Sequence, residues 1–290
     1  YEVPLLMRKE KLDERALTKL RLPQKDQPNI DDWREFLGRL HNPTNEVTIG
    51  LVGKYVELPD AYKSIAESFI HAGAHLECKV NVRWISSETI NDKSVRRVLK
   101  DLDGVLVAPG FGERGIEGKI EAIKFVREHQ IPFFGICLGM QCAVVEFARN
   151  VLGKTGAAST EIDPETKFPV IDLMEDQKNV TEYGGTMRLG AYECKLSKGS
   201  HAVHAYGRQK IEERHRHRYE FNNQYLQEFE KAGMKAVGVN PKSGLVEIVE
   251  IPEHPYFVAT QFHPELKSTV MNPHPLFMSF IGAAVRGQRD

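Results

Sequence analysis

Cysteine is scarce in this sequence, and a long apolar run is missing. The four cysteines, Cys78, Cys137, Cys142 and Cys194, form no Cys-x-x-Cys pair, which argues against a disulfide-rich secreted scaffold and against a zinc ribbon. No apolar stretch approaches the roughly 18 residues that a membrane-spanning helix needs. Charged residues at positions 8–11 interrupt the start of the chain early, which is not the pattern of a signal peptide. We therefore expect a cytoplasmic protein with no membrane contact and no bound metal.

A strong net charge of either sign is also missing. The formal net charge is −1, so no overall field favours DNA, RNA or an anionic membrane. No Walker-type phosphate-binding motif occurs, and Gly50–Lys54 does not match one, so we expect no nucleotide hydrolysis by this chain. The 41% apolar and 27% charged composition is ordinary for a soluble globular protein. A length of 290 residues allows one large domain or two small ones.

The first 45 residues differ from the rest of the chain. They are rich in charge, proline and asparagine, with one short helical segment at Asp31–Leu40 that Asp31 or Asp32 could cap. This composition favours a linker or the end of a neighbouring domain, and an ordinary amino-terminal extension fits it equally well. We expect residues 1–45 to be such a tail and residues 46–290 to form the main domain.

From residue 46 onward, strand and helix patterns alternate. Repeated β–α units predict an α/β fold with a central, mostly parallel sheet and helices on both faces. The second half predicts an additional antiparallel strand region after a long irregular connection at 153–186. The expected strands are 47–52, 79–85, 104–108, 132–136, 187–196, 213–221, 235–240, 244–251 and 257–262. One expected helix begins at Asp60, and the others cover 86–100, 117–129, 138–150, 223–232 and 274–285.

The strongest chemical signal is a cysteine at the end of the strand expected at 132–136. There Gly135-Ile-Cys137-Leu-Gly139 leads directly into a helix, which is the arrangement of a nucleophile elbow with cysteine in place of serine. A helix amino terminus beneath the sulfur favours the thiolate, and its N–H groups can stabilise an oxyanion. The two glycines permit close approach of neighbouring backbone. A buried structural cysteine at a tight turn is the alternative interpretation.

A thiolate nucleophile requires a base, and one histidine is placed to act as one. Gln261-Phe-His263-Pro-Glu265 follows an apolar strand, and the spacing lets the carboxylate of Glu265 orient the imidazole of His263. The alternative is a surface His-Pro-Glu turn. A glycine-rich loop at 109–115 follows another strand and could offer N–H groups to an oxyanion.

Arginines alternate with histidines near residue 215. At strand period Arg214, Arg216 and Arg218 share one face, and His215 and His217 share the other. Because guanidinium groups hold carboxylates by paired hydrogen bonds, the arginine face could bind a carboxylate. A solvated basic strand or a nucleic-acid patch are the alternatives, and the near-zero net charge and the absence of interleaved aromatic residues weaken the second.

In this order, the glycine-rich loop, the cysteine elbow and the Gln-Phe-His-Pro-Glu turn resemble those of class I glutamine amidotransferases. The stretches 52–63, 159–161, 185–190 and 213–219 resemble the CTP synthase branch of that family. The resemblance covers the chain from about residue 46 and, more weakly, the preceding tail. It implies the class I glutamine amidotransferase fold.

The resemblance also implies roles for individual residues. Cys137, His263 and Glu265 match the catalytic triad of the family. One departure is Pro109, which stands where the family usually has glycine; since proline has no N–H group, the oxyanion donors would be Gly110 and Leu138. The glutamine-binding positions implied are Gly110, Leu138, Gly139, Met140, Gln141, Glu161 and Arg218, and Arg188 falls in a stretch similar to the lid that responds to GTP.

The resemblance finally implies a reaction and its partners. L-glutamine would be hydrolysed through a cysteine thioester, and the ammonia would feed ATP-dependent amination of UTP to CTP on a linked synthetase domain. ATP and Mg²⁺ would bind the synthetase domain, and no cofactor would bind this chain. GTP would be an allosteric activator, and the full enzyme would be a tetramer. Two rivals remain: a γ-glutamyl peptidase on the same fold and a catalytically silent regulatory domain.

Overall fold

One large mixed sheet organises the molecule. The computed structural model describes residues 1–24, 29–173 and 187–288. The strands of this sheet are β1 (Asn45–Gly53), β2 (Cys78–Ser86), β3 (Gly104–Val107), β4 (Phe133–Ile136), β7 (Arg188–Leu196), β8 (Lys210–His217), β10 (Lys235–Val239), β11 (Val246–Glu250) and β12 (Phe257–Thr260). Their order is β2-β1-β3-β4-β12-β11-β10-β7-β8. The first five are mutually parallel and the remaining pairings are antiparallel, as the α/β prediction with an antiparallel region requires.

Side chains of the parallel strands alternate between two cores. Val52 and Phe133 belong to one buried cluster, whereas Leu51 and Phe134 belong to the other. Because successive side chains of a strand point to opposite faces, these continuous apolar runs indicate strands that are covered on both sides. The prediction of a sheet with helices on both faces is confirmed.

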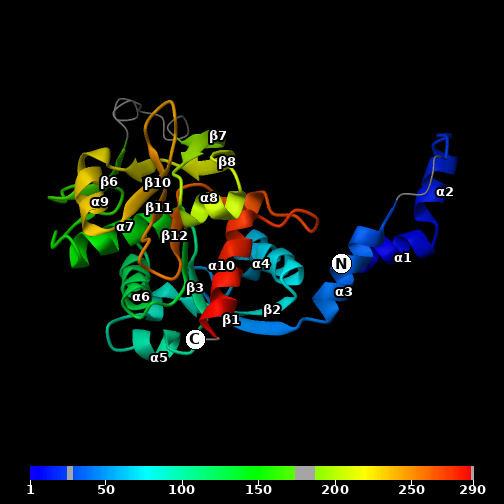
Figure 1. The fold of residues 1–290 in the computed structure, drawn as a ribbon, viewed down its shortest axis with the longest axis horizontal. Helices are drawn as coiled ribbons and strands as arrows, with labels where there is room; N and C mark the ends of the chain where they lie inside the picture. The colour runs from blue at the N-terminus through cyan, green and yellow to red at the C-terminus, as the bar shows by residue number, and fades with distance from the viewer. Residues whose placement is uncertain (25–28, 174–186, 289–290) are drawn as a thin grey trace.

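The helices form a layer on each face (Figure 1). One layer holds α4 (Lys63–His75), α8 (His201–Tyr206) and α10 (Pro275–Gly287), and the other holds α5 (Val95–Leu99), α6 (Ile116–Glu128), α7 (Leu138–Asn150) and α9 (Leu226–Ala232). In the described parts of the chain, every helix is too short or too polar to cross a bilayer. Helix α8 was not predicted, and the bounds predicted for α7 are confirmed.

Two predicted helices begin or continue differently. The α-helix after β1 begins at Lys63, because Pro59–Tyr62 form a 3-10 turn. The single helix expected over 86–100 is wrong: Ser87–Thr89 form a 3-10 turn, and α5 starts only at Val95. Between them, the side chain of Asn91 accepts from the N–H groups of Lys93 and Ser94. Such local side-chain bonds offer the backbone an alternative to the helix.

The amino-terminal segment extends away from the sheet (Figure 1). Helices α1 (Val3–Lys9) and α2 (Leu12–Lys19), which were not predicted, bury none of their side chains. Helix α3 (Asp31–His41) confirms the predicted helical segment and buries Phe36 and Leu37. The predicted cap is wrong, because the side chains of Asp31 and Asp32 make no capping bond and Ile30 is the capping residue.

A second, three-stranded sheet packs against α7. It contains β5 (Ala158–Ser159), β6 (Pro169–Leu173) and β9 (Tyr219–Phe221) in the order β5-β6-β9. The irregular connection predicted at 153–186 is therefore wrong for β5 and β6, and its residues 174–186 lie outside the described chain. The strand expected at 213–221 divides at Arg218 into β8 of the large sheet and β9 of the small one.

Candidate active site

Cys137 lies in a strained turn between β4 and α7. Its φ of 53° and ψ of −103° are costly for a residue with a Cβ atom, and such conformations cluster at functional sites. The turn is held because the Cys137 N–H donates to the Thr260 carbonyl at 2.7 Å. A Cβ atom on Gly139 would lie 2.3 Å from the carbonyl oxygen of Val107, so glycine lets α7 pack against β3. The thiol is 2% exposed.

His263 and Glu265 follow the strand beside the one that carries Cys137. Strands β4 and β12 are parallel, and Thr260 is in register with Ile136, so both segments leave the sheet at the same edge. His263 Nδ1 lies 2.7 Å from Glu265 Oε1, and the His263 N–H donates to the Arg214 carbonyl at 2.8 Å. Both side chains are buried. The structure therefore brings the three predicted triad residues together.

The imidazole of His263 is biased toward its protonated form. Burial alone would lower its pKa, but interactions with Cys137 and Glu265 outweigh burial and raise the pKa of His263 to about 10. Among the described residues, no hydrogen bond of normal geometry reaches Nε2. The raised pKa keeps the imidazole of His263 protonated at neutral pH.

Two lysines hold the glycine-rich loop after β3. Lys54 Nζ donates to the carbonyls of Phe111 and Gly112, and the fully buried Lys119 Nζ donates to the Ala108 carbonyl at 2.8 Å. A Cβ atom on Gly110 would lie 3.5 Å from the side chain of Leu138, so the loop sits directly beside the elbow. Burial lowers the pKa of Lys119 to about 8.

A cavity of about 340 Å³ opens beside Cys137. Glu161 and Arg218 lie in its wall, and Glu161 Oε1 accepts the Gly112 N–H at 3.0 Å. Of the predicted glutamine-binding residues 138–141, Gln141 lines this cavity. Met140 is fully buried in the core, and Gly139 packs against β3. The lining residues are Gly110, Phe111, Cys137, Gln141, Glu161, Met187, Arg216, His217, Arg218 and Tyr219.

Arg188, predicted to belong to a lid, is buried in ion pairs behind this cavity. Its guanidinium donates to Glu220 at 3.0 Å and to Glu247 at 2.9 Å, joining β7 to β9 and β11. Burial raises the pKa of Glu220 to about 8 and also raises that of Glu247, although the charge of Arg188 opposes both shifts. Residues 185 and 186 of the lid-like stretch lie outside the described chain.

Arg188→Met is expected to lower the free energy of unfolding at about pH 8 by about 3–5 kcal/mol, because two buried carboxylates lose their cation. A carboxyl whose pKa is raised by folding stabilises the protein below its unfolded pKa and loses that contribution as pH rises. The loss of unfolding free energy in Arg188→Met should therefore become smaller toward about pH 5, as the two carboxyl groups become protonated. Urea unfolding at both pH values tests this. The control is Arg39→Met, which removes an exposed pair with Glu35 and should cost less than about 1 kcal/mol; equal losses would contradict the expectation.

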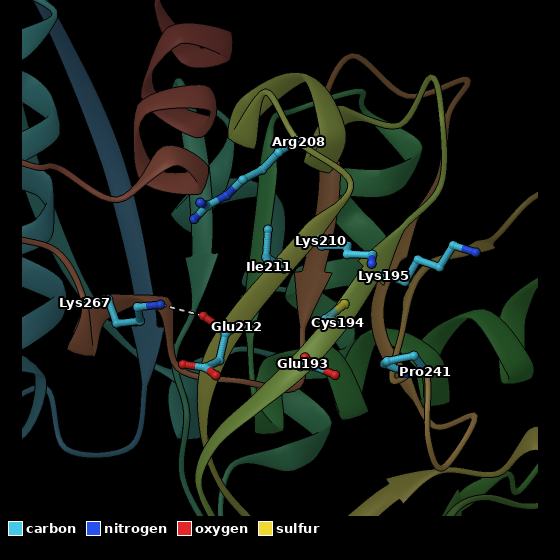
Figure 2. Close-up of a pocket in the computed structure, with 9 residues that line it drawn as sticks. All are labelled: Glu193, Cys194, Lys195, Arg208, Lys210, Ile211, Glu212, Pro241 and Lys267. Carbon is cyan, nitrogen blue, oxygen red and sulfur yellow. Dashed lines mark hydrogen bonds between the residues drawn. The ribbon is translucent and has the colours of Figure 1, made fainter.

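A larger hollow, of about 510 Å³, lies elsewhere, over β7 and β8 (Figure 2). Its rim carries charges of both signs, including Glu193, Lys195 and Lys210. Its one thiol, Cys194, is buried, and burial raises the pKa of that thiol, so the thiol stays protonated. The smaller cavity is the one that Cys137 lines.

The chain is similar to known proteins in sequence and in fold. A family model described as glutamine amidotransferase class-I matches residues 57–283. The Trypanosoma brucei CTPS glutaminase domain with bound acivicin superposes with a TM-score of 0.79 and 37% identity, covering 83% of this chain and 94% of that one. A putative GMP synthase protein from Thermoplasma acidophilum, at 16% identity and a TM-score of 0.54 over 84% of this chain and 96% of that one, shares the fold.

The chain therefore belongs to the class-I glutamine amidotransferase family. Within that family it is similar to CTP synthases: it is 66% identical over 284 residues to the enzyme of Cytophaga hutchinsonii, covering 98% of this chain and 53% of that protein. It is 58% identical over 285 residues to the CTP synthase of Bacteroides fragilis, covering 98% of this chain and 54% of the relative. The chain spans about half the length of these relatives.

Proposed function

We propose that this chain hydrolyses L-glutamine to glutamate and ammonia through a γ-glutamyl thioester on Cys137. The observation that carries the proposal is the cavity that opens onto Cys137 with Glu161 and Arg218 in its wall. An α-amino acid has one ammonium and one carboxylate, and these two side chains offer the complementary charges. The rest of the cavity leaves room for the side-chain amide of glutamine beside the sulfur.

In the first half-reaction the Cys137 thiolate attacks the side-chain amide carbon, forming a carbon–sulfur bond and an oxyanion. The N–H groups of Gly110 and Leu138 donate to that oxyanion. Protonated His263, oriented by Glu265, gives its proton to the departing nitrogen, and the carbon–nitrogen bond breaks to release ammonia.

In the second half-reaction His263 takes a proton from water while the water oxygen attacks the thioester carbon. The carbon–sulfur bond then breaks, glutamate leaves, and the thiolate–imidazolium pair is restored. Atoms and charges balance over the two steps, since one water is consumed and one ammonia is formed.

We further propose that the whole protein uses this ammonia to aminate UTP to CTP. The likeness to CTP synthases of about twice this length supports a linked synthetase domain, which would bind ATP and Mg²⁺ and build a tetramer. The described part of this chain offers no phosphate-binding loop for ATP and Mg²⁺. The extended α1–α2 segment, with exposed Leu6 and Met7, fits a connection to that domain. We place the protein in the cytoplasm, where its four free thiols stay reduced.

We also propose that GTP stimulates the reaction through the segment around Arg188. This guanidinium is 7% exposed and bonded to two carboxylates, so it does not fit direct nucleotide contact in this conformation. A response to GTP would then change the position of Met187, which lines the cavity beside Cys137.

Glutamine specificity is tested by Glu161→Gln, which keeps the shape and removes the charge that would meet the substrate ammonium. Losing one charged hydrogen bond costs about 1.5–3 kcal/mol, so kcat/KM for glutamine should fall about 10- to 100-fold, mainly through KM. Steady-state ammonia release measures this. Glu165→Gln, an exposed neighbour, is the control. Faster hydrolysis of a γ-glutamyl peptide than of glutamine by the unaltered protein would instead support a peptidase.

A further inference from the structure

The Cys137 sulfur has a second polar neighbour besides His263. The side chain of Gln261 is fully buried, and its Nε2 lies 3.8 Å from Cys137 Sγ, within hydrogen-bond range of a sulfur acceptor. Gln261 precedes His263 by two residues on the segment that leaves β12. The same short segment therefore brings both an imidazole and an amide to one sulfur.

The orientation of the Gln261 amide is fixed by its neighbour. Gln141 Nε2 donates to Gln261 Oε1 at 3.4 Å and to the Tyr219 carbonyl at 3.1 Å. Since Oε1 of Gln261 accepts from Gln141, its Nε2 must face the sulfur. The Gln261 N–H donates to the Glu247 carbonyl at 2.9 Å, which fixes the backbone beneath the amide.

These contacts form a relay from the cavity wall to the nucleophile. Gln141 and Tyr219 line the cavity, whereas Gln261 does not. A neutral amide that donates to sulfur stabilises the thiolate and takes no part in proton transfer. It thereby differs from His263, whose proton must leave with ammonia.

We propose that Gln261 is a positioning residue that holds the Cys137 sulfur as a thiolate and fixes its direction toward the cavity, with Gln141 setting the orientation of the Gln261 amide. The inference rests on the proposed function of Cys137 as the nucleophile. It adds a role for Gln261 in how that nucleophile is prepared before substrate arrives.

The test is the pH dependence of iodoacetamide alkylation at Cys137 in the full chain, followed by mass spectrometry of the Cys137 peptide. Gln261→Met removes the donor without adding charge, and Gln261→Glu keeps the acceptor for Gln141 but replaces the donor with a carboxylate oxygen. Each should move the midpoint of the pH profile upward, Gln261→Glu further. A midpoint that is higher by about one pH unit makes alkylation at lower pH about tenfold slower. The kcat for glutamine should fall with little change in KM.

Two further variants separate the relay from a general packing effect. Gln141→Met leaves Gln261 in place but frees its amide to rotate, so its midpoint should shift upward by less than that of Gln261→Met. Gln224→Glu makes the same chemical change at an exposed position and should leave the profile unchanged. Thermal unfolding checks that each variant is folded.

An unchanged midpoint in folded Gln261→Met would overturn the proposal, even if Gln261→Glu shifted it, because added charge alone would then explain the shift. Alkylation does not require glutamine turnover. A protein that alkylates as expected but never hydrolyses glutamine would therefore refute the proposed function and leave the assignment of Gln261 standing.

Discussion

Cys137→Ala is expected to lower the rate of glutamine hydrolysis by a factor on the order of 10⁴ or more, because the covalent route is lost entirely. The fold should persist: alanine removes only the sulfur, and the turn is held by the bond from the residue-137 N–H to Thr260. Ammonia release measures the rate, and circular dichroism with thermal unfolding checks the fold.

The chain offers a matched control for this variant. Cys142 lies five positions later, inside α7, and burial raises the pKa of its thiol to about 11. Cys142→Ala should lose some stability and keep kcat within a few-fold. If Cys142→Ala abolished hydrolysis while Cys137→Ala did not, the nucleophile would be misassigned.

His263→Asn is expected to have a comparable effect on hydrolysis, on the order of 10⁴ in kcat, since the proton donor for ammonia is removed. The variant should also remove the cation that lies beside the Cys137 sulfur and favours its reaction with electrophiles. Alkylation near pH 7 should then slow more than tenfold and recover as pH rises.

The same variant has a signature in stability. The pKa of His263 is raised by folding from 6.5 to about 10, so its protonation stabilises the folded state fully below about pH 6.5, and that contribution is lost as pH rises through about 10. The difference in unfolding free energy between the unaltered protein and His263→Asn should therefore narrow across this window. A difference that widened with pH would contradict a stabilised imidazolium.

The elbow and its helix could be predicted from the sequence because their determinants are local. Apolar residues before Cys137 dictate a buried strand, and Gly139 permits close packing against β3. The mostly apolar segment after the elbow then forms α7, which is buried from Leu138 to Ala148. The parallel neighbours β4 and β12 then bring the ends of two distant motifs together. The strand-end rule pointed to Cys137, and His263 was expected beside it because a thiolate requires a base and because its motif resembles that of the family.

Features that depend on tertiary partners could not be predicted in this way. The alternation of buried and exposed residues continues unbroken along β8 to His217, so nothing local marks the break at Arg218; pairing of β9 with β6 sets it. Helices α1 and α2 bury no residue, so packing against the rest of the described chain does not specify them.

Two unpredicted residues did carry a signal. Lys119 stands on the face of α6 that also presents Ile116, Ile120 and Ile123 to the core, and a lysine on an apolar face calls for an explanation. Gln261 interrupts an apolar run just before His263. In each case a polar residue in a position expected to be buried was the available clue.

The measurement that tests the central claim most directly is mass spectrometry of the chain after brief incubation with L-glutamine and acid quenching. We expect a γ-glutamyl adduct on the peptide that contains Cys137, and we expect none in Cys137→Ala. In His263→Asn, when a reactive glutamyl ester loads the thiol, the adduct should decay more slowly. Labelling of Cys137 by a glutamine-like electrophile should block the adduct. Ammonia release without any adduct, or an adduct on another residue, would contradict the account.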